Sequence, residues 1–153
     1  MSLNQSSFQP SLKGRALRLL SQREHSRTEL ERKLAQHEEV PGELAKALDE
    51  LQARDFINDV RAVDSLVNRR AGKLGSVRIK QELARKGLSG QVVAEALTGL
   101  KDSELSRAQE VWRKKFGSLP QDPKTRAKHM RFLLTRGFSA EVVRQVVLGA
   151  EPD

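Results

Sequence analysis

The sequence has no cysteine and no tyrosine, and only 4% of its residues are aromatic. The absence of cysteine excludes disulfides and cysteine-ligated metal sites and suits a reducing compartment, so we expect a cytoplasmic protein. Long hydrophobic runs are also missing, because no stretch approaches the roughly 20 apolar residues that a helix needs to cross a membrane. The polar residues 1–14 lack the apolar segment of a signal peptide, so we expect a soluble protein that is not exported.

Motifs of catalysis are absent as well. The chain has no phosphate-binding G-x-x-x-x-G-K-[ST] loop, no nucleophile elbow and no pair of zinc ligands. Its three histidines, His25, His37 and His129, are scattered and lie next to charged residues, so we predict them on the surface rather than at a metal. We therefore expect no enzymatic activity, no cofactor and no metal.

An internal repeat is the most informative feature that is present. Residues 79–97 recur in altered form at residues 129–147, fifty positions later. Each copy has an apolar helical pattern, a basic residue before a glycine, then a serine and a second amphipathic segment. A third copy upstream keeps only the apolar spacing, at Leu30, Leu34, Val40, Leu44, Leu48 and Leu51. This period indicates about three modules, each too small to bury much apolar surface alone.

The apolar periodicity predicts helices, and no segment alternates over a useful length as a half-buried strand does. We predict an all-α fold of about nine helices in an elongated, curved array of three tandem three-helix repeats. The predicted repeats cover residues 12–57, 58–101 and 102–150, and residues 1–11 are expected to be a flexible N-terminus. Separate helices are expected at about residues 89–97 and 103–116.

Capping signals mark several helix ends. Ser26 and Glu29 have the spacing of a capping box, in which the serine oxygen accepts from the N3 amide and the glutamate accepts from the cap amide. Asp122 before Pro123 is a further N-cap signal, because proline fits the first position of a helix. The other predicted N-caps are Ser76, Ser89 and Ser139, and the predicted left-handed helix ends are Gly87 and Gly137.

Positive charge is concentrated beyond the first third of the chain. The net charge is +8, yet residues 1–53 hold 8 basic and 8 acidic side chains, whereas residues 54–153 hold 20 and 12. Residues 69–86 contain seven basic side chains and one acidic side chain, Glu82, and residues 124–136 contain five basic ones and no acidic one. An excess of this size attracts polyanions.

These basic stretches have an ordinary explanation as solvated helix surfaces. We favour a binding face, because the single carboxylate weakly relieves the repulsion among the cations, whereas a polyanion would relieve it and release counterions. The predicted binding residues are Arg69, Arg70, Lys73, Arg78, Lys80, Arg85, Lys86, Lys124, Arg126, Lys128, Arg131 and Arg136. Trp112 and Phe116 could form a base-stacking platform, but so few aromatics leave no stacking track, and we predict core packing instead.

Four motifs occur in a specific order and spacing. They are His25-Ser26-Arg27 with Glu29-Leu30 and Lys33-Leu34, then Phe56-Ile57-Asn58-Asp59, then Arg78-Ile79-Lys80-Gln81-Glu82-Leu83 with Lys86-Gly87-Leu88, and finally Arg131-Phe132-Leu133-Leu134-Thr135-Arg136-Gly137-Phe138. Together they resemble the RecX family of bacterial recombinase regulators, and the resemblance covers most of the chain from about Ala16 onward.

The resemblance implies tandem three-helix repeats without catalysis that bind the RecA recombinase filament. Such a protein inhibits the ATPase, co-protease and strand-exchange activities of RecA, and so modulates recombinational DNA repair and the SOS response. It implies weaker, non-specific contact with single- and double-stranded DNA, and we expect a monomer without membrane association. The residues alone leave one alternative open, a stand-alone DNA-binding protein whose three-helix units act as helix-turn-helix modules.

Overall fold

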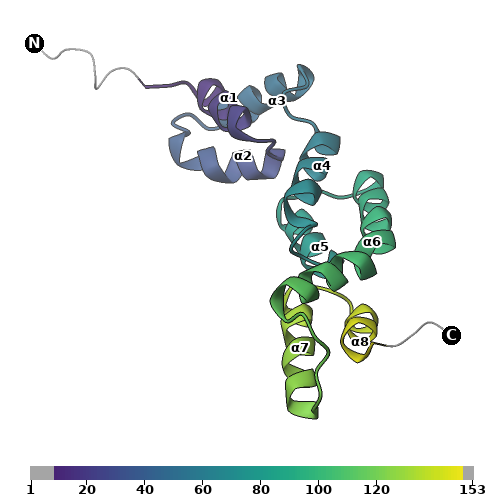
Figure 1. Ribbon diagram of the computed structural model, residues 1–153. Helices are drawn as coiled ribbons and strands as arrows, with labels where there is room; N and C mark the ends of the chain where they lie inside the picture. Colours follow the sequence, from purple (N-terminus) through teal and green to yellow (C-terminus); the bar gives the residue numbers. More distant parts are fainter. Residues whose placement is uncertain (1–8, 150–153) are drawn as a thin grey trace, which may run out of the picture. The chain divides into compact units, whose positions relative to one another are not determined.

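The computed structural model describes residues 9–149, and this part of the chain is all-helical, as predicted (Figure 1). Its helices are α1 (Leu12–Gln22), α2 (Arg27–Leu34), the 3-10 helix η1 (Ala35–His37), α3 (Glu43–Ala53), α4 (Asp59–Arg70), α5 (Ser76–Arg85), α6 (Gln91–Lys115), α7 (Pro123–Thr135) and α8 (Ala140–Leu148). The predicted flexible N-terminus falls mainly on residues 1–8, which lie outside the described residues.

The chain divides into two compact units, which we call unit 1 and unit 2. Unit 1 extends to Ser65 and unit 2 begins at Leu66, so that α4 contributes its first part to one unit and its last part to the other. The predicted boundary between residues 101 and 102 falls inside the continuous helix α6. The elongated, curved arrangement and the limits of the three repeats stay predictions from the sequence.

Unit 1 is a small helical core made by α1, α2 and α3, which pack against one another. Leu30, Leu48 and Leu51 are fully buried between these helices, together with Ala16. The capping box that begins α2 is confirmed, since Ser26 Oγ accepts from Glu29 N at 3.1 Å and Glu29 Oε1 accepts from Ser26 N at 3.0 Å. Local sequence therefore determines where α2 begins.

His25 precedes this cap and is buried, which contradicts its predicted surface position. Only 1% of the residue is exposed, and its two ring nitrogens lie 3.0 Å from the Arg23 carbonyl oxygen and 2.9 Å from Lys33 Nζ. Because an ammonium group only donates, Nε2 accepts from Lys33 and Nδ1 carries the proton that is donated to Arg23. Burial is the main cause that lowers the pKa of His25, and the charges of Arg23 and Lys33 lower it further.

We expect the free energy of unfolding to decrease as the pH falls from about 7.5 to 5. An unfolded histidine titrates near pH 6.5, whereas the pKa of His25 lies below that value in the folded protein. The unfolded chain therefore binds more protons in this window, and acidification favours it. Urea unfolding followed by circular dichroism should show a shallower pH dependence for His25→Asn than for the wild type. Equal pH slopes for the two proteins would contradict this role of His25.

Unit 2 is organised by the 25-residue helix α6, which replaces the two helices predicted at residues 89–97 and 103–116. Gly99 lies in its interior, and glycine costs about 1 kcal/mol there relative to alanine. Packing offsets that cost, because Leu100 and Glu104 in the middle of α6 are buried, and α6 contacts α5, α7 and α8. The predicted cap at Ser89 is also wrong, since Gly90 is the N-cap of α6.

The beginning of α5 is held by a residue from α6. Ser76 is the first residue of α5 and not its N-cap, which is Gly75, so the predicted serine cap is wrong. The buried carboxylate of Glu104 instead accepts from Ser76 N at 2.9 Å and from Ser76 Oγ at 2.8 Å. A carboxylate suits this position, because the first amides of a helix have no partner within the helix and carry partial positive charge.

The end of α7 lies directly against the start of α5. Gly75 N donates to the Arg136 carbonyl at 2.8 Å, and Val77 N donates to the Gly137 carbonyl at 3.0 Å. Gly137 has the predicted left-handed backbone, with φ of 92°, and Gly87 has φ of 72°. The caps of α7 and α8 are confirmed, since Asp122 accepts from Thr125 N and Ser139 accepts from Val142 N. The hydrogen bonds of Gly75 N and Val77 N to the end of α7 connect the predicted second and third repeats within unit 2.

Candidate functional site

A pocket of about 600 Å³ in unit 2 carries five cations and is the candidate site. Its lining residues are Asn68, Arg69, Gly72, Lys73, Val111, Lys114, Lys115, Phe132 and Arg136. None of these described residues is Asp or Glu. We call it the cationic pocket. A single site of this kind can hold phosphate or carboxylate groups by charge-assisted hydrogen bonds.

Three helix C-termini supply four of the five charges, and the fifth is Lys73 in the turn after α4. Arg69 lies in the last turn of α4, Lys114 and Lys115 end α6, and Arg136 is the C-cap residue of α7. Each position favours a cation locally, because the unsatisfied carbonyls at a helix C-terminus carry partial negative charge. The fold brings the three helix ends to one pocket, and the cations at these ends therefore concentrate positive charge there.

Phe132 is the aromatic residue among those that line the pocket. Lys115 Nζ lies 5.5 Å and Arg136 Cζ lies 5.0 Å from the centroid of its ring, so both cations are oriented by the ring face. Phe116 contacts the same ring edge to face, with the centroids 5.4 Å apart. These contacts hold Lys115 and Arg136 close to Phe132, whereas unconstrained lysine and arginine side chains would sample many rotamers.

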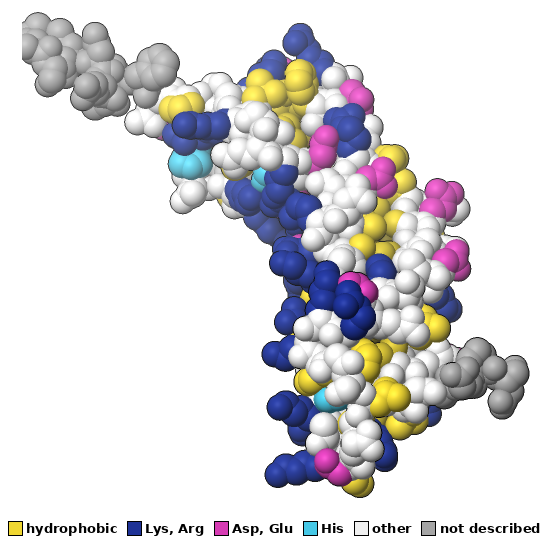
Figure 2. Space-filling model, in the orientation of Figure 1, with side chains coloured by type: hydrophobic (Ala, Val, Ile, Leu, Met, Phe, Trp, Pro, Cys, Tyr) yellow, Lys and Arg dark blue, Asp and Glu magenta, His cyan; other side chains and the backbone are white. Residues whose placement is uncertain are grey.

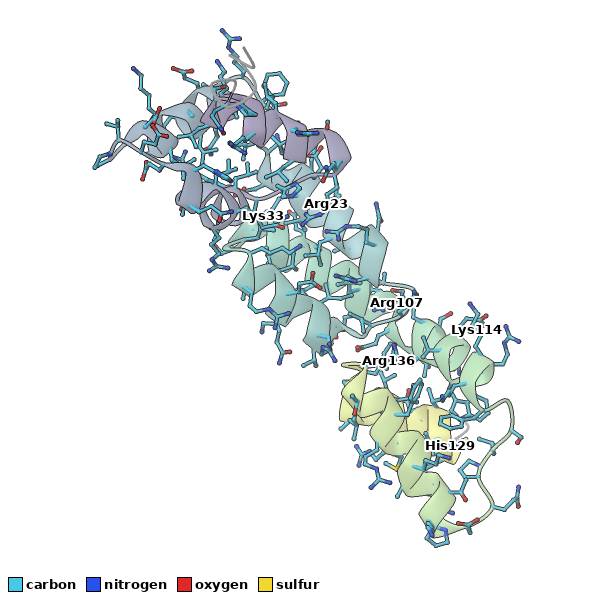
Figure 3. The ribbon with its side chains drawn as sticks, turned by 90° about the vertical axis from the view of Figure 1, so that its left-hand side faces the viewer. Arg23, Lys33, Arg107, Lys114, His129 and Arg136 are labelled. Carbon is cyan, nitrogen blue, oxygen red and sulfur yellow. The ribbon has the colours of Figure 1, made fainter. Side chains whose placement is uncertain are left out.

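Phe116 belongs to an aromatic cluster with His129 and Trp112. Phe116 stacks on His129 with ring centroids 3.7 Å apart, and Trp112 Nε1 donates to His129 Nδ1 at 3.1 Å. His129, labelled in Figure 3, is buried, which contradicts its predicted surface position. Burial lowers its pKa, and the charge of Lys128 lowers it further. Trp112 packs against the core of α6, α7 and α8, which confirms the prediction of a packing role for this residue.

Three of the twelve predicted binding residues line the cationic pocket: Arg69, Lys73 and Arg136. Arg78 instead bridges two helices, since its Nη1 donates to the Thr135 carbonyl at 2.7 Å. The remaining exposed members lie elsewhere on the surface of α5 and α7, at Lys80, Arg85, Lys124, Lys128 and Arg131, and Arg126 is half-buried. Figure 2 shows many Lys and Arg side chains along one side of unit 2, at its left edge in that view.

Glu82 relieves more repulsion than we expected. Its carboxylate lies 3.0 Å from Arg70 Nε and 3.4 Å from Lys86 Nζ, and so it forms ion pairs with two of the predicted binding residues at once. Burial alone would raise the pKa of Glu82, but the hydrogen bond from Arg70 and the charges of both cations lower it. Repulsion at Arg70 and Lys86 is therefore partly relieved within the protein itself.

Two residues of the pocket, Lys114 and Lys115, were missed by the sequence analysis. The run Arg113-Lys114-Lys115 at the end of a helix was a visible signal, but it stands apart from the two basic stretches. The sequence also gives no indication of the structural role of Arg107, which does not line the pocket. Its guanidinium donates to the carbonyls of Ala71, Leu74 and Leu100, and burial lowers its pKa (Figure 3).

Two searches of the described residues give negative results. In residues 9–149 no helix is both long and apolar enough to cross a bilayer. Over the same residues, no cluster of three or more His, Asp or Glu side chains is arranged so that it could hold a metal ion.

Family models match three successive segments of the chain. They describe the first, second and third three-helix domains of RecX, and they match residues 13–51, 58–97 and 102–147. Two relatives, both named "Regulatory protein RecX", come from Leptothrix cholodnii and Ralstonia nicotianae. They are 52% and 44% identical to this chain, over 91% and 92% of its length and 88% and 89% of theirs.

Solved structures share the fold. A crystal structure of regulatory protein RecX has a TM-score of 0.73 at 22% identity, covering 91% of this chain and 72% of the other. A crystal structure of RecX from Lactobacillus salivarius has a TM-score of 0.72 at 22% identity, covering 90% of this chain and 93% of the other. With three successive domain matches and relatives of up to 52% identity among those compared, the chain belongs to the RecX family of regulatory proteins.

Proposed function

We propose that this protein binds the RecA nucleoprotein filament and inhibits its ATPase, co-protease and strand-exchange activities. It thereby modulates recombinational DNA repair and the SOS response, as a cytoplasmic monomer that acts by binding and not by catalysis. Membership in the RecX family supports the regulatory role. The structural observation that carries the proposal is the cationic pocket, where five cations from three helix ends and the turn after α4 line one cavity.

A nucleoprotein filament suits this pocket because its DNA is a polyanion. Neutralising phosphates releases condensed counterions, and on single-stranded DNA each contact adds about −0.7 to the slope of log affinity against log salt. Contacts of this kind read no sequence, so the DNA component is non-specific and weaker than the binding of the assembled filament. Lys73 and Lys114 are exposed lysines of the pocket and suit such contacts.

The test is RecA-catalysed ATP hydrolysis on single-stranded DNA, measured with increasing amounts of this protein. We expect the steady-state rate to fall at substoichiometric to equimolar ratios of this protein to RecA. An unchanged rate, together with unchanged co-protease and strand-exchange activities, would remove the proposal. Tight, sequence-selective duplex binding without RecA would instead support the stand-alone DNA-binding protein.

A further inference from the structure

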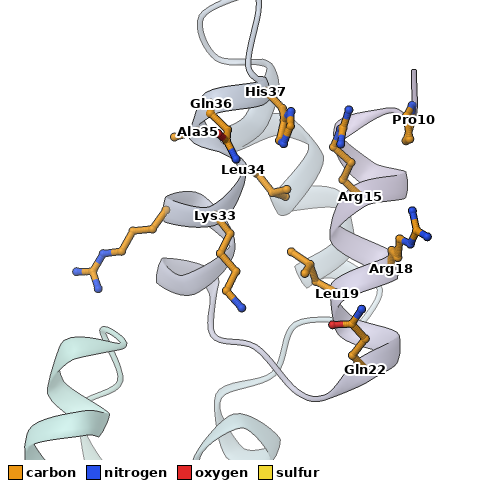
Figure 4. A pocket seen from close by; sticks show the side chains of 11 residues that line it. Pro10, Arg15, Arg18, Leu19, Gln22, Lys33, Leu34, Ala35, Gln36 and His37 are labelled. Carbon is orange, nitrogen blue, oxygen red and sulfur yellow. The ribbon is translucent and has the colours of Figure 1, made fainter. Parts of the chain in front are cut away.

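Unit 1 has its own cavity, a groove of about 700 Å³ between α1 and the segment formed by α2 and η1 (Figure 4). Its lining residues are Pro10, Arg15, Arg18, Leu19, Gln22, Arg32, Lys33, Leu34, Ala35, Gln36 and His37. We call it the unit 1 groove. Its volume lies in the range of about 300–1,000 Å³ that is typical of ligand pockets.

The floor of the unit 1 groove is aliphatic. Leu19 and Leu34 approach each other from α1 and α2 across the groove (Figure 4). Leu34 is a buried member of the unit 1 core, and Leu19 is partly buried against it. An apolar side chain placed on these two leucines would extend the core of unit 1, and burial of apolar surface favours it by about 25 cal/mol per Å².

The rim of the groove is basic. Arg15, Arg18, Arg32 and Lys33 all belong to the lining, which has no Asp or Glu among the described residues. This local excess of positive charge occurs although residues 1–53 hold equal numbers of acidic and basic side chains. A ligand that fits both rim and floor therefore combines negative charge with an apolar anchor.

Two observations favour an acidic peptide over a nucleic acid. An adjoining pocket shares Pro10, Arg15, Gln36 and His37 with the groove but is also lined by Glu39 and Glu43. A polyanion that continued past Arg15 would meet these carboxylates, whereas a short acidic segment can end before them. The lining also contains no Phe, Tyr or Trp on which successive bases could stack.

We propose that the unit 1 groove binds a short acidic peptide segment of a partner protein, in which one large aliphatic or aromatic side chain is flanked by Asp or Glu. The apolar side chain rests on Leu19 and Leu34, and the flanking carboxylates meet the basic rim at Arg15 and Arg18. Buried apolar anchors surrounded by complementary charge are a common arrangement in protein recognition. The inference stands independently of the proposed filament function, which rests on unit 2.

The test uses the full chain as bait in a selection from a random displayed peptide library, without RecA and without DNA. We expect selected sequences that place Asp or Glu around a Leu, Ile, Met or Phe. A fluorescent synthetic peptide of the selected sequence is then titrated against the protein by anisotropy. Replacing its apolar anchor with Ser should weaken binding by about tenfold or more.

Variants of the protein locate the site. Arg15→Glu/Arg18→Glu should raise the peptide Kd by about tenfold or more, whereas the control Lys46→Glu/Arg54→Glu should change it less than about twofold. The control residues are exposed, carry the same charge change and do not line the groove. If circular dichroism shows that the Glu pair does not fold, Arg15→Gln/Arg18→Gln takes its place.

Several outcomes would overturn the inference. They are a selection without an acidic and apolar consensus, equal weakening by the groove pair and the control pair, and an unchanged Kd in the groove pair. Loss of oligothymidylate binding in the groove pair, with peptide binding intact, would assign the groove to nucleic acid instead.

Discussion

Gly75→Ala is expected to destabilise the protein by about 3 kcal/mol or more and to lower the midpoint of thermal unfolding strongly. A Cβ at this position would lie 2.3 Å from the Gly137 carbonyl oxygen and 2.4 Å from Phe138 N. Both atoms belong to the backbone, so no side-chain rotation relieves the clash. The start of α5 and the end of α7 would have to separate, and the hydrogen bond from Gly75 N to the Arg136 carbonyl would be lost.

Gly137→Val should be equally severe for two reasons. Its φ of 92° is unfavourable for a β-branched residue, and a Cβ would lie 2.2 Å from Arg78 Cγ and 2.7 Å from Arg78 N. Gly99→Ala is the control, because nothing lies within 4 Å of its Cβ position in the middle of α6. Alanine there should stabilise by about 0.5–1 kcal/mol. Thermal unfolding that leaves Gly75→Ala at the wild-type midpoint would show that the contact between α5 and α7 is not tight.

Reversal of three pocket charges should abolish most of the affinity for single-stranded DNA. For Lys73→Glu/Lys114→Glu/Lys115→Glu we expect a loss of about 100-fold or more at about 50 mM salt, because three favourable phosphate contacts become repulsive. The slope of log affinity against log salt should become shallower by about 2. Anisotropy of a labelled oligothymidylate measures both quantities.

The matched control is Lys101→Glu/Arg113→Glu/Arg144→Glu, which makes the same change in net charge outside the cationic pocket. All three residues are exposed, and Arg113 pairs with Glu110 at 2.6 Å. If this variant loses as much affinity as the pocket variant, net charge and not the pocket determines DNA binding.

Helix boundaries could be predicted where the signal is local. Ser26, Asp122 and Ser139 each accept from the amide three residues further along, so the sequence shows both partners together. The prediction of an N-cap at Ser76 was wrong, because its partner, Glu104, lies 28 residues further along the chain. Such a contact depends on tertiary packing, which residue spacing does not display.

The continuity of α6 could not be predicted for a related reason. Residues 98–102 include Gly99 and are mostly polar, which favours a break on propensity alone. Burial of Leu100 and Glu104 keeps the helix intact through this segment. Tertiary packing commonly overrides weak local preference in this way.

The sequence shows the sign of the charge at the candidate site but not which residues come together there. The two basic stretches place an excess of positive charge in the later part of the chain, and three of their members line the cationic pocket. Lys114 and Lys115 belong to the same pocket only because the ends of α4, α6 and α7 converge. The burial of His25 was not predicted, because its charged neighbours in the sequence favoured a surface position. In the fold, the Arg23 carbonyl and Lys33 form hydrogen bonds with both ring nitrogens, so the ring can be buried.

The most direct measurement of whether the cationic pocket holds the RecA filament is the inhibition of RecA ATP hydrolysis by the wild type, the pocket variant and the matched control. We expect the wild type and the control Lys101→Glu/Arg113→Glu/Arg144→Glu to lower the rate at equal concentrations. The pocket variant Lys73→Glu/Lys114→Glu/Lys115→Glu should leave the rate unchanged while its circular dichroism spectrum stays helical. Inhibition by the pocket variant equal to that of the wild type would contradict the proposed site.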